Sequence, residues 1–349
     1  MKSASIRDVA KAAGVSVGTV SNVLNEPGRV SPATVDRVRH AMTDLGFIRN
    51  DAARQLRGGN SRTIGLVVLD SANPFFADVA KGAEAAAEDE GQIVLLGNSD
   101  NRAEREARYL TDFVERRVTG VLVSPVGDVS PGLDRLREHG IPVVIVDRRA
   151  KDGIWSSVSV DDVAGGSMAA RHLLGSGRRR LAFVGGPASL RQVADRLSGA
   201  REAVGDVPDA TLEVVETLDL TVEAGRSAAE EIIKTQPGHR PDAVFAANDL
   251  VAVGVLQGLV MTGSLRVPED IALVGYDDID FARATVVPLT SVRQPREQMG
   301  RTAVDLLRAE IADPDRAPEQ VVFAPELVVR SSSGPGKAGP DGGAPGRCA

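Results

Sequence analysis

The sequence predicts two parts of different fold class: an N-terminal all-α helix-turn-helix head, and a two-lobed α/β core of doubly wound parallel sheets. Three observations predict this division. Residues 6–25 have the spacing of two short helices around a tight turn, buried strands alternate with helices from Thr63 onward, and this alternation begins again after Asp161.

The first stretch, residues 6–25, carries the helix-turn-helix pattern. Apolar residues recur at three- and four-residue intervals up to Ala13, and the same period restarts at Val20 after an interruption at Gly14. Gly14 can adopt the left-handed conformation that ends a helix, and Ser16 offers an oxygen to cap the next one. The small side chain of Ala10 suits a close crossing of the two helices.

The second helix of a helix-turn-helix lies in the major groove of DNA, with its N-terminal residues at the base edges. We expect Val17, Gly18 and Asn22 to face the bases. Short polar side chains on neighbouring faces suit phosphate oxygens, and these are Ser16, Thr19, Ser21 and Asn25. On this segment alone an ordinary α-domain remains an alternative. The G-x-S-x-G pattern of a hydrolase nucleophile elbow is also present, but that elbow needs a strand before the serine, and here a helix precedes it.

Residues 27–46 predict a third helix that closes the bundle. Pro27 and Gly28 form a loop, Ser31 caps the helix, Pro32 takes its first position and Gly46 ends it. The expected apolar stripe is Val35, Val38, Met42 and Leu45. Residues 50–61 favour helix but contain too few apolar residues to hold one against a core, so they are either a linker or a segment that orders on binding.

From Thr63 the chain reads as repeated βαβ units. Strands are expected within 63–70, 92–97, 120–125 and 142–147, with helices over 76–90, 102–116 and 131–139. After residues 157–161 a second set of strands and helices follows, and ligands of such sheets bind beyond the carboxyl ends of the strands. A long helix after residue 290 and apolar residues near 321–330 give the chain the material to return to both lobes.

These patterns divide the chain into a head (1–49), a segment that is either a hinge helix or a linker (50–61), a core (62–330) and a tail (331–349). Within the core we expect an N-lobe of about 62–160 plus 292–318, and a C-lobe of about 161–291 plus 319–330. The tail is rich in Gly, Pro and Ser and is predicted to be disordered.

Composition limits the function classes. The 349 residues are 42% hydrophobic and 26% charged, without a long apolar run or a secretory leader, which predicts a cytoplasmic protein that does not enter membranes. The single Cys348 fits a reducing compartment, and the four histidines show no metal-ligand spacing, so neither a metal nor a cofactor is expected. The net charge is −7, but the segment up to Arg62 holds ten Lys and Arg against five Asp and Glu, which concentrates attraction to phosphate in the head.

The motifs resemble those of the LacI/GalR family of bacterial transcription repressors over essentially the whole chain to Arg330. They lie in residues 6–25, in the N-x-x-A-x-x-L of Asn50, Ala53 and Leu56, and in SVSVDDVAGG, FVGGP, FAANDLVAVG, VGYDDIDFA and PLTSVRQP. The resemblance implies a periplasmic-binding-protein-like core and a hinge that folds to a helix on operator DNA. It also implies that Leu56 wedges into the minor groove, an insertion whose unstacking cost is offset by contacts on the bent duplex.

The resemblance also implies effector-contacting positions in the cleft between the lobes. These are Asp147, Asp161, Arg196, Asn248 and Asp277, with apolar faces from Phe75, Phe76 and, as a further candidate, Trp155. Carboxylates, an amide and a planar guanidinium suit the hydroxyls of a sugar or a related metabolite. The alternative is that such residues only cap the following helices, a role we expect for Asp249 and Asp278.

Three departures from the family pattern concern DNA recognition. Gly18 offers no side chain to a base, Asn22 replaces an arginine common in some members, and Arg49 stands where proline is usual before Asn50. Direct readout then depends on Val17, which can touch a thymine methyl, and Asn22, which can pair with adenine.

The predicted protein is a homodimeric repressor, with a tetramer as the alternative, that binds a pseudopalindromic operator under the control of an effector. The rival functions are a solute-binding protein of the same fold, a constitutive repressor, and an enzyme. No nucleophile with a nearby base and no phosphate-binding loop supports the last of these.

Overall fold

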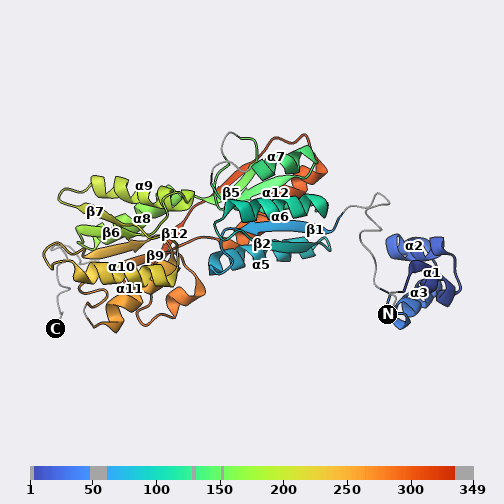
Figure 1. Ribbon diagram of the computed structural model, residues 1–349, viewed down its shortest axis with the longest axis horizontal. Coiled ribbons are helices and arrows are strands. Elements are labelled where there is room, and N and C mark those ends of the chain that lie inside the picture. The colour runs from blue at the N-terminus through green and yellow to red at the C-terminus, as the bar shows by residue number, and fades with distance from the viewer. Residues whose placement is uncertain (1–3, 48–60, 128–130, 151–152, 264, 335–349) are drawn as a thin grey trace, which may run out of the picture. The chain divides into compact units, whose positions relative to one another are not determined.

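The structure is a computed structural model that describes residues 4–47, 61–127, 131–150, 153–263 and 265–334 (Figure 1). The chain divides into two compact units, Met1–Ser61 and Arg62–Ala349, and each is considered by itself. The predicted hinge residues Asn50, Ala53 and Leu56 lie outside the described residues, as does Arg49.

The first unit is a helical bundle of α1 (Ile6–Ala13), α2 (Val17–Asn25) and α3 (Pro32–Asp44), with a 3-10 turn at Pro27–Arg29. Its core consists of Val9, Ala10, Ala13, Val20, Val23, Val35, Val38 and Ala41. Gly14 ends α1 with φ of +63°, and Ser16 Oγ accepts the Thr19 backbone N–H at 3.0 Å. The predicted helix-turn-helix is confirmed.

Two expectations about α3 are wrong in detail. Ser31 stands at the N-cap position, but its hydroxyl donates to Thr34 Oγ1 at 2.9 Å and does not accept a backbone N–H. Leu45 lies beyond the last turn and is 40% exposed, so Ala41 takes the place in the core that periodicity gave to Leu45.

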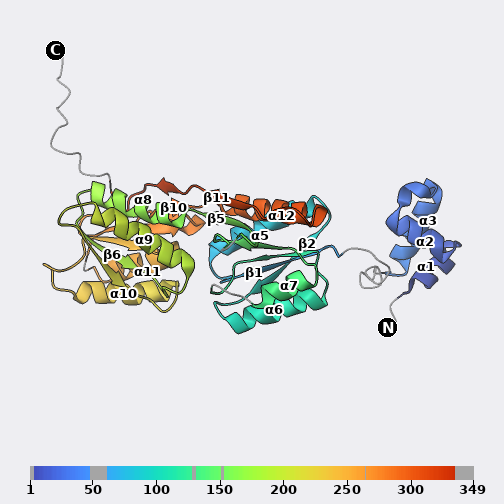
Figure 2. The same cartoon turned by 90° about the horizontal axis from the view of Figure 1, so that it is seen from above.

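The N-lobe contains a six-stranded parallel sheet in the order β11-β5-β4-β3-β1-β2. Its strands are β1 (Thr63–Val68), β2 (Ile93–Asn98), β3 (Gly120–Val123), β4 (Val143–Val146), β5 (Ser156–Val160) and β11 (Gln320–Phe323). One face is covered by α5 (Pro74–Glu88) and α12 (Arg296–Ala312), and the other by α6 (Ala103–Glu115) and α7 (Pro131–Glu138) (Figure 2).

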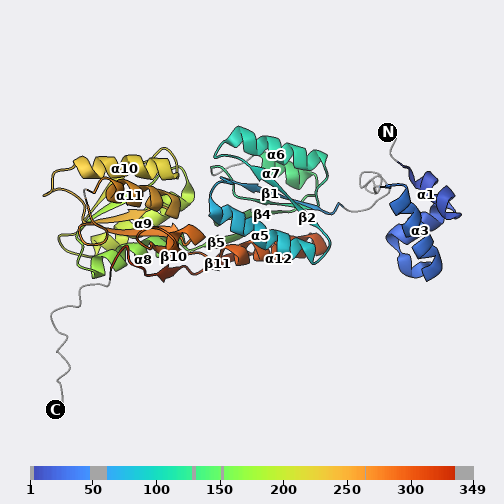
Figure 3. The ribbon, with the colours of Figure 1, turned by 90° about the horizontal axis from the view of Figure 1, so that it is seen from below.

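The C-lobe repeats this architecture in the order β12-β10-β9-β8-β6-β7. Its strands are β6 (Arg180–Val184), β7 (Thr211–Val215), β8 (Ala243–Ala246), β9 (Ala272–Asp277), β10 (Thr290–Arg293) and β12 (Glu326–Val328), of which β12 runs antiparallel to β10. Helices α8 (Asp162–Gly175) and α9 (Arg191–Gly205) cover one face, and α10 (Val222–Lys234) and α11 (Asp249–Met261) the other (Figure 3). A short 3-10 helix, η2 (Asp280–Arg283), follows β9. The predicted pair of doubly wound lobes is confirmed.

The predicted lobe boundaries near the end of the chain are wrong. β11 lies within the range assigned to the C-lobe, yet it pairs with β5 in the N-lobe sheet. Val292 and Arg293 were assigned to the N-lobe, yet they belong to β10 and pair with β9. Within the described residues the chain passes between the lobes after β5, after β10 and after β11.

The expectation of a disordered tail from residue 331 is also wrong at its start. Ser332 and Ser333 are buried, and Ser332 Oγ accepts the Thr290 N–H at 2.8 Å and donates to the Leu273 carbonyl at 2.6 Å. The segment up to Gly334 is therefore part of the C-lobe, while residues 335–349 lie outside the described ranges. No helix in the described ranges has the length and apolar character that crossing a membrane requires.

Candidate functional site

The exposed face of α2 carries most of the residues expected to read DNA. Val17 is 39% exposed, Gly18, Asn22 and Asn25 are exposed, and Val20 and Val23 on the opposite face are buried. Ser21 is half-buried and accepts a hydrogen bond from Asn25 Nδ2 at 3.3 Å. The helix thus presents a narrow polar face with one apolar side chain near its N-terminus.

Ser16 and Thr19 are engaged within the head. Besides capping α2, Ser16 Oγ lies 2.9 Å from Thr19 Oγ1. The preceding helix has a capping box that the sequence reasoning missed: Ser5 caps the Asp8 N–H, and Asp8 Oδ2 accepts the Ser5 N–H at 2.8 Å. The signal was present, because Ser followed by an acidic residue three positions later is the pattern of such a box.

In the second unit, a cavity of about 410 Å³ lies at the carboxyl ends of strands from both lobes. Its walls come from loops after the strands and from the first turns of α5 and α9. The lining residues are Leu69, Asp70, Asn73, Phe75, Phe76, Asp100, Asn101, Asp147, Pro187, Leu190, Gln192, Val193, Arg196, Leu218, Asp219, Leu220, Thr221, Asn248 and Asp277. Six of the seven predicted effector residues are among them.

Arg196 is the centre of the C-lobe wall. Its Nε donates to Asp162 Oδ1 at 2.8 Å, its Nη1 donates to the Ala247 carbonyl at 2.8 Å, and its Nη2 lies 3.8 Å from Asp277 Oδ1. The guanidinium carbon is 3.7 Å from the centroid of the Tyr276 ring, a cation-π arrangement. Burial lowers the pKa of Arg196, but the negative charges of Asp162 and Asp277 raise it by more than burial lowers it. The net pKa is raised, so the guanidinium stays charged.

Two carboxyl groups of the cavity are buried and held by glutamines. Gln192 Nε2 donates to Asp147 Oδ2 at 2.6 Å, and Gln294 Nε2 donates to Asp277 Oδ1 at 2.7 Å. Burial raises the pKa of Asp147 well above its usual range, and repulsion from Asp162 raises it more. Burial also raises the pKa of Asp277, which attraction to Arg196 partly offsets. Asp147 can then act as a hydrogen-bond donor, while Arg196 stabilises the charged form of Asp277.

The N-lobe contributes an apolar wall. Phe75 and Phe76 lie in the first turn of α5, are 2% and 5% exposed, and their rings meet edge to face with centroids 5.0 Å apart. Asn73 caps the helix by accepting the Phe75 N–H at 3.0 Å, which fixes both rings at the start of the helix. Trp155 is absent from the lining; it is partly buried against the core beside α7, with Arg137 over its ring at 5.9 Å.

Asn248 lines the cavity and also caps α11, because its Oδ1 accepts the Val251 N–H at 2.9 Å. Asp161, in contrast, is not a lining residue: it caps α8 by accepting the Ala164 N–H at 3.0 Å. The expectation for Asp161 is corrected to a helix cap, and its neighbour Asp162 is the residue that reaches Arg196.

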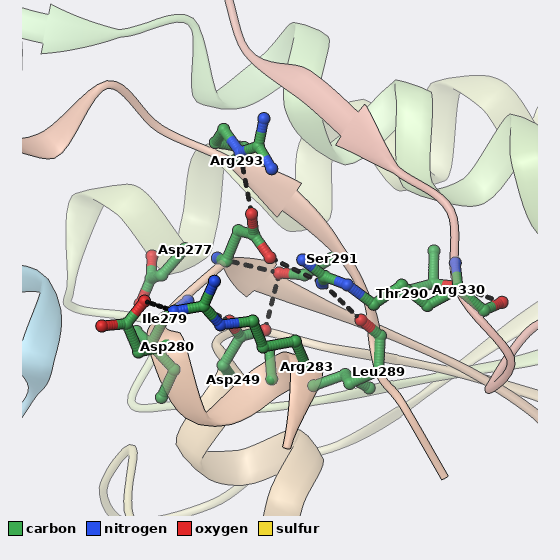
Figure 4. A network of polar contacts seen from close by, with 12 residues as sticks. Asp249, Asp277, Ile279, Asp280, Arg283, Leu289, Thr290, Ser291, Arg293 and Arg330 are labelled. Atoms are coloured by element: carbon green, nitrogen blue, oxygen red, sulfur yellow. Dashed lines mark hydrogen bonds and ion pairs between the residues drawn. The ribbon is translucent and has the colours of Figure 1, made fainter. Parts of the chain in front are cut away.

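The expected capping role of Asp249 and Asp278 is wrong, because Asn248 caps α11 and the 3-10 helix η2 has no side-chain cap. Figure 4 shows the polar network that holds Asp249 instead. Asp249 is buried and accepts from Ser291 Oγ at 2.7 Å and from the Ile279 N–H at 2.8 Å. Asp278 forms ion pairs with Arg293 at 2.8 Å and Arg330 at 2.6 Å. Together they fix the loop that follows β9, next to the cavity residue Asp277.

Sequence reasoning missed Asp162, Gln192, Gln294 and Tyr276. One signal was available for Gln192, which precedes Arg196 by four residues and so shares its face of α9. The arrangement offers directional hydrogen bonds opposite an apolar face. No group of three or more His, Cys, Asp and Glu side chains in the described ranges is placed to hold a metal ion.

Comparison with known proteins supports the division of this chain into a helical head and a two-lobed core. Residues 5–50 match the family described as bacterial regulatory proteins, lacI family, and residues 170–333 match the periplasmic binding protein-like domain. The ribose operon repressor of Bacillus subtilis is 37% identical over 304 residues, which cover 87% of this chain and 90% of that protein.

Two solved structures are similar over most of this chain. A LacI family transcriptional regulator from Enterococcus faecium with bound ribose is 28% identical, with a TM-score of 0.71, and covers 78% of this chain and 99% of its own. The lac repressor dimer bound to operator and the anti-inducer ONPF is 26% identical, with a TM-score of 0.83, and covers 96% of this chain and 100% of its own.

Proposed function

This chain belongs to the LacI family of bacterial regulatory proteins, and from that premise we propose that it is a dimeric repressor whose operator affinity is set by a neutral sugar in the cleft. The cluster of Arg196, Asp162 and Asp277 opposite Phe75 and Phe76 carries the proposal. A sugar ring has hydroxyls at its edge and apolar C–H faces, so this pair of walls complements it.

The charge of the cavity favours a sugar without a phosphate group. The carboxylates of Asp70, Asp100, Asp219 and Asp277 line it, together with the buried Asp147 that acts as a donor, against the single guanidinium of Arg196. An anion would meet repulsion at several points, and Arg196 is already engaged with Asp162. D-Ribose is the first candidate because it is the ligand of one similar structure.

Calorimetric titration of the full chain with D-ribose, other neutral pentoses and hexoses, and D-ribose 5-phosphate tests this proposal. We expect a neutral sugar to bind and to change operator affinity, and the phosphorylated sugar to bind at least about tenfold more weakly, a difference of 1.4 kcal/mol. Binding of the phosphate ester in preference to every neutral sugar would contradict the proposal.

The variant Asp277→Asn should abolish the sugar-induced change in operator affinity while operator binding itself persists.

DNA binding rests on the exposed face of α2. In this proposal the exposed Val17 and Asn22 contact bases, Gly18 allows close approach, and Ser16, Thr19, Ser21 and Asn25 contact phosphates. The family pattern of Asn50, Ala53 and Leu56 supports a hinge helix with Leu56 as the minor-groove wedge.

Leu56→Ala should weaken operator binding by about tenfold or more, because the unstacking cost is no longer offset by an apolar insertion. Fluorescence anisotropy with a labelled operator measures this. Sugar binding is the internal control, since residue 56 precedes the core segment 62–330 in the sequence. Unchanged operator affinity would remove the wedge from the proposal.

Apolar side chains on an edge strand support the dimer. Ile93, Leu95 and Leu96 of β2 are 64%, 37% and 46% exposed, and β2 lies at the edge of its sheet. Exposed apolar residues on an edge strand are typical of a surface that a partner covers. The mass in solution from light scattering distinguishes a dimer from a monomer or a tetramer.

We also propose that the protein is cytoplasmic and has no enzymatic role.

A further inference from the structure

The loop after β9 combines a cavity residue with an unusual backbone. Asp277 and Asp278 have φ of +103° and +51°, the left-handed region that side chains other than glycine rarely adopt. The Asp277 carboxylate faces the cavity, while the carbonyl oxygens of both residues accept hydrogen bonds from Arg296 Nη1. The backbone of the effector site therefore depends on a side chain from outside the C-lobe.

Arg296 is the first residue of α12, which packs against the N-lobe sheet. Its Nε donates to Asp78 Oδ2 of α5 at 2.8 Å, and the two side chains are only 15% and 30% exposed. One guanidinium thus contacts the C-lobe loop through Nη1 and an N-lobe helix through Nε. The same helix, α5, carries Phe75 and Phe76 of the opposite cavity wall.

Both ends of this connection are anchored. On the C-lobe side, Asp278 is held by Arg293 and Arg330. On the N-lobe side, α5 and α12 pack so closely that a Cβ added at Gly82 would lie 2.0 Å from the Glu297 carbonyl oxygen. Because both ends are anchored, a movement of the C-lobe wall that carries the Asp277–Asp278 loop changes the distance from this loop to Asp78 unless α5 moves with it.

We propose that the Arg296–Asp78 ion pair couples occupancy of the cleft to the position of the N-lobe. A sugar that binds Asp277 shifts the C-lobe wall together with this anchored loop, and Arg296 keeps its contacts with both carbonyls and Asp78 only if α5 follows. Arg296 and Asp78 do not line the cavity, so they are positioning residues. This inference rests on the proposed sugar-controlled function, because a ligand shifts an equilibrium only through its differential affinity for the two states.

Asp78→Asn tests the inference, since it removes one charge without changing side-chain size. The matched control is Arg308→Gln: Arg308 also joins α12 to α5, through the Ala86 carbonyl at 2.5 Å, and its ion pair is with Asp305 of α12 itself. In each variant, operator affinity is measured by fluorescence anisotropy with and without D-ribose, or the neutral sugar that binds best. The affinity for that sugar is measured by calorimetry.

We expect the sugar-induced change in operator affinity to fall from about tenfold or more in the unaltered chain to less than about threefold in Asp78→Asn. Sugar affinity should stay within about threefold of the unaltered chain, and Arg308→Gln should behave like the unaltered chain. Asp78→Glu should restore the response. A normal response in Asp78→Asn, or a loss of response explained by lost sugar affinity, overturns the inference.

A second measurement needs no sugar and separates this inference from the proposed function. In a Cys348→Ser background, spin labels at Glu90→Cys and Glu213→Cys report the distance between the lobes by pulsed electron resonance. We expect a broader distance distribution in Asp78→Asn than in the unaltered chain or in Arg308→Gln. Identical distributions in all three proteins overturn the coupling role even if sugar binding is confirmed.

Discussion

The two lobes share one sheet topology but divide the chemistry of the cleft unequally. The strands of the two sheets follow the same spatial order, β11-β5-β4-β3-β1-β2 in the N-lobe and β12-β10-β9-β8-β6-β7 in the C-lobe. In each lobe the cavity residues follow the carboxyl ends of parallel strands. The N-lobe supplies the rings of Phe75 and Phe76, whereas the C-lobe supplies the paired charges of Arg196 and Asp277. Topology thus fixes where a ligand can bind, and the side chains at each wall decide what it can be.

The two walls also differ in whether their side chains need internal partners when no ligand is bound. A ring wall is stable without a ligand, because Phe75 and Phe76 belong to the N-lobe core. A charged wall needs internal partners, and Asp162, Ala247 and Gln294 provide them. The C-lobe wall is therefore a closed network in which each change affects several groups.

Arg196→Met should have the largest effect, because it leaves Asp162 and Asp277 buried without their counter-charge. We expect the free energy of unfolding of the core to fall by roughly 3–5 kcal/mol, with loss of sugar binding. Urea denaturation followed by circular dichroism measures the change. The control is Arg116→Met in the N-lobe, where the exposed ion pair with Asp112 contributes little. Equal unfolding curves for the two variants would contradict the assignment of the network.

Alanine at two equivalent glycines should have the next largest effect. A Cβ at Gly166 would lie 2.0 Å from the Arg196 carbonyl oxygen, as a Cβ at Gly82 would from that of Glu297. Overpacking should destabilise each variant by about 1–3 kcal/mol. Only Gly166→Ala should also weaken sugar binding, because it displaces Arg196. A comparable loss of sugar affinity in Gly82→Ala would show that the two walls are not separable.

Asp147→Asn should change the free energy of unfolding least, and the size of this change should depend on pH. The folded-state pKa of Asp147 is raised, so its contribution to stability is fully present below the unfolded value of about 3.9 and is lost as pH rises. The variant has no such loss, and we expect it to be more stable than the unaltered chain near pH 7 by at least about 1 kcal/mol. Denaturation at pH 5 and pH 8 measures this. A stability difference that does not grow with pH would disprove the raised pKa.

Local features of the fold could be predicted from the sequence because they depend on neighbouring residues. The turn at Gly14, the cap at Ser16 and the buried strands each follow from a few adjacent positions. The cavity residues at strand ends, such as Asp147 and Asp277, follow from the same logic together with the family pattern.

Features that depend on distant partners could not be predicted in this way. Asp161 and Asp162 are adjacent and chemically identical, and only the placement of Arg196, 34 residues from Asp162, makes one a cap and the other an ion-pair partner. The assignment of β11 to the N-lobe depends on its pairing with β5, about 160 residues earlier in the chain. Periodicity contains no information about such pairings.

The three passages between the lobes also determine the order in which the protein can be completed during translation. The N-lobe core includes Met299, Ala303, Val304 and Leu307 from α12, and the last strand of the C-lobe sheet is β12. A nascent chain that ends before Arg296 therefore contains neither finished lobe. The bundle of α1, α2 and α3 has its own core within the first 47 residues, so the part that reads DNA can fold on the ribosome well before the part that regulates it.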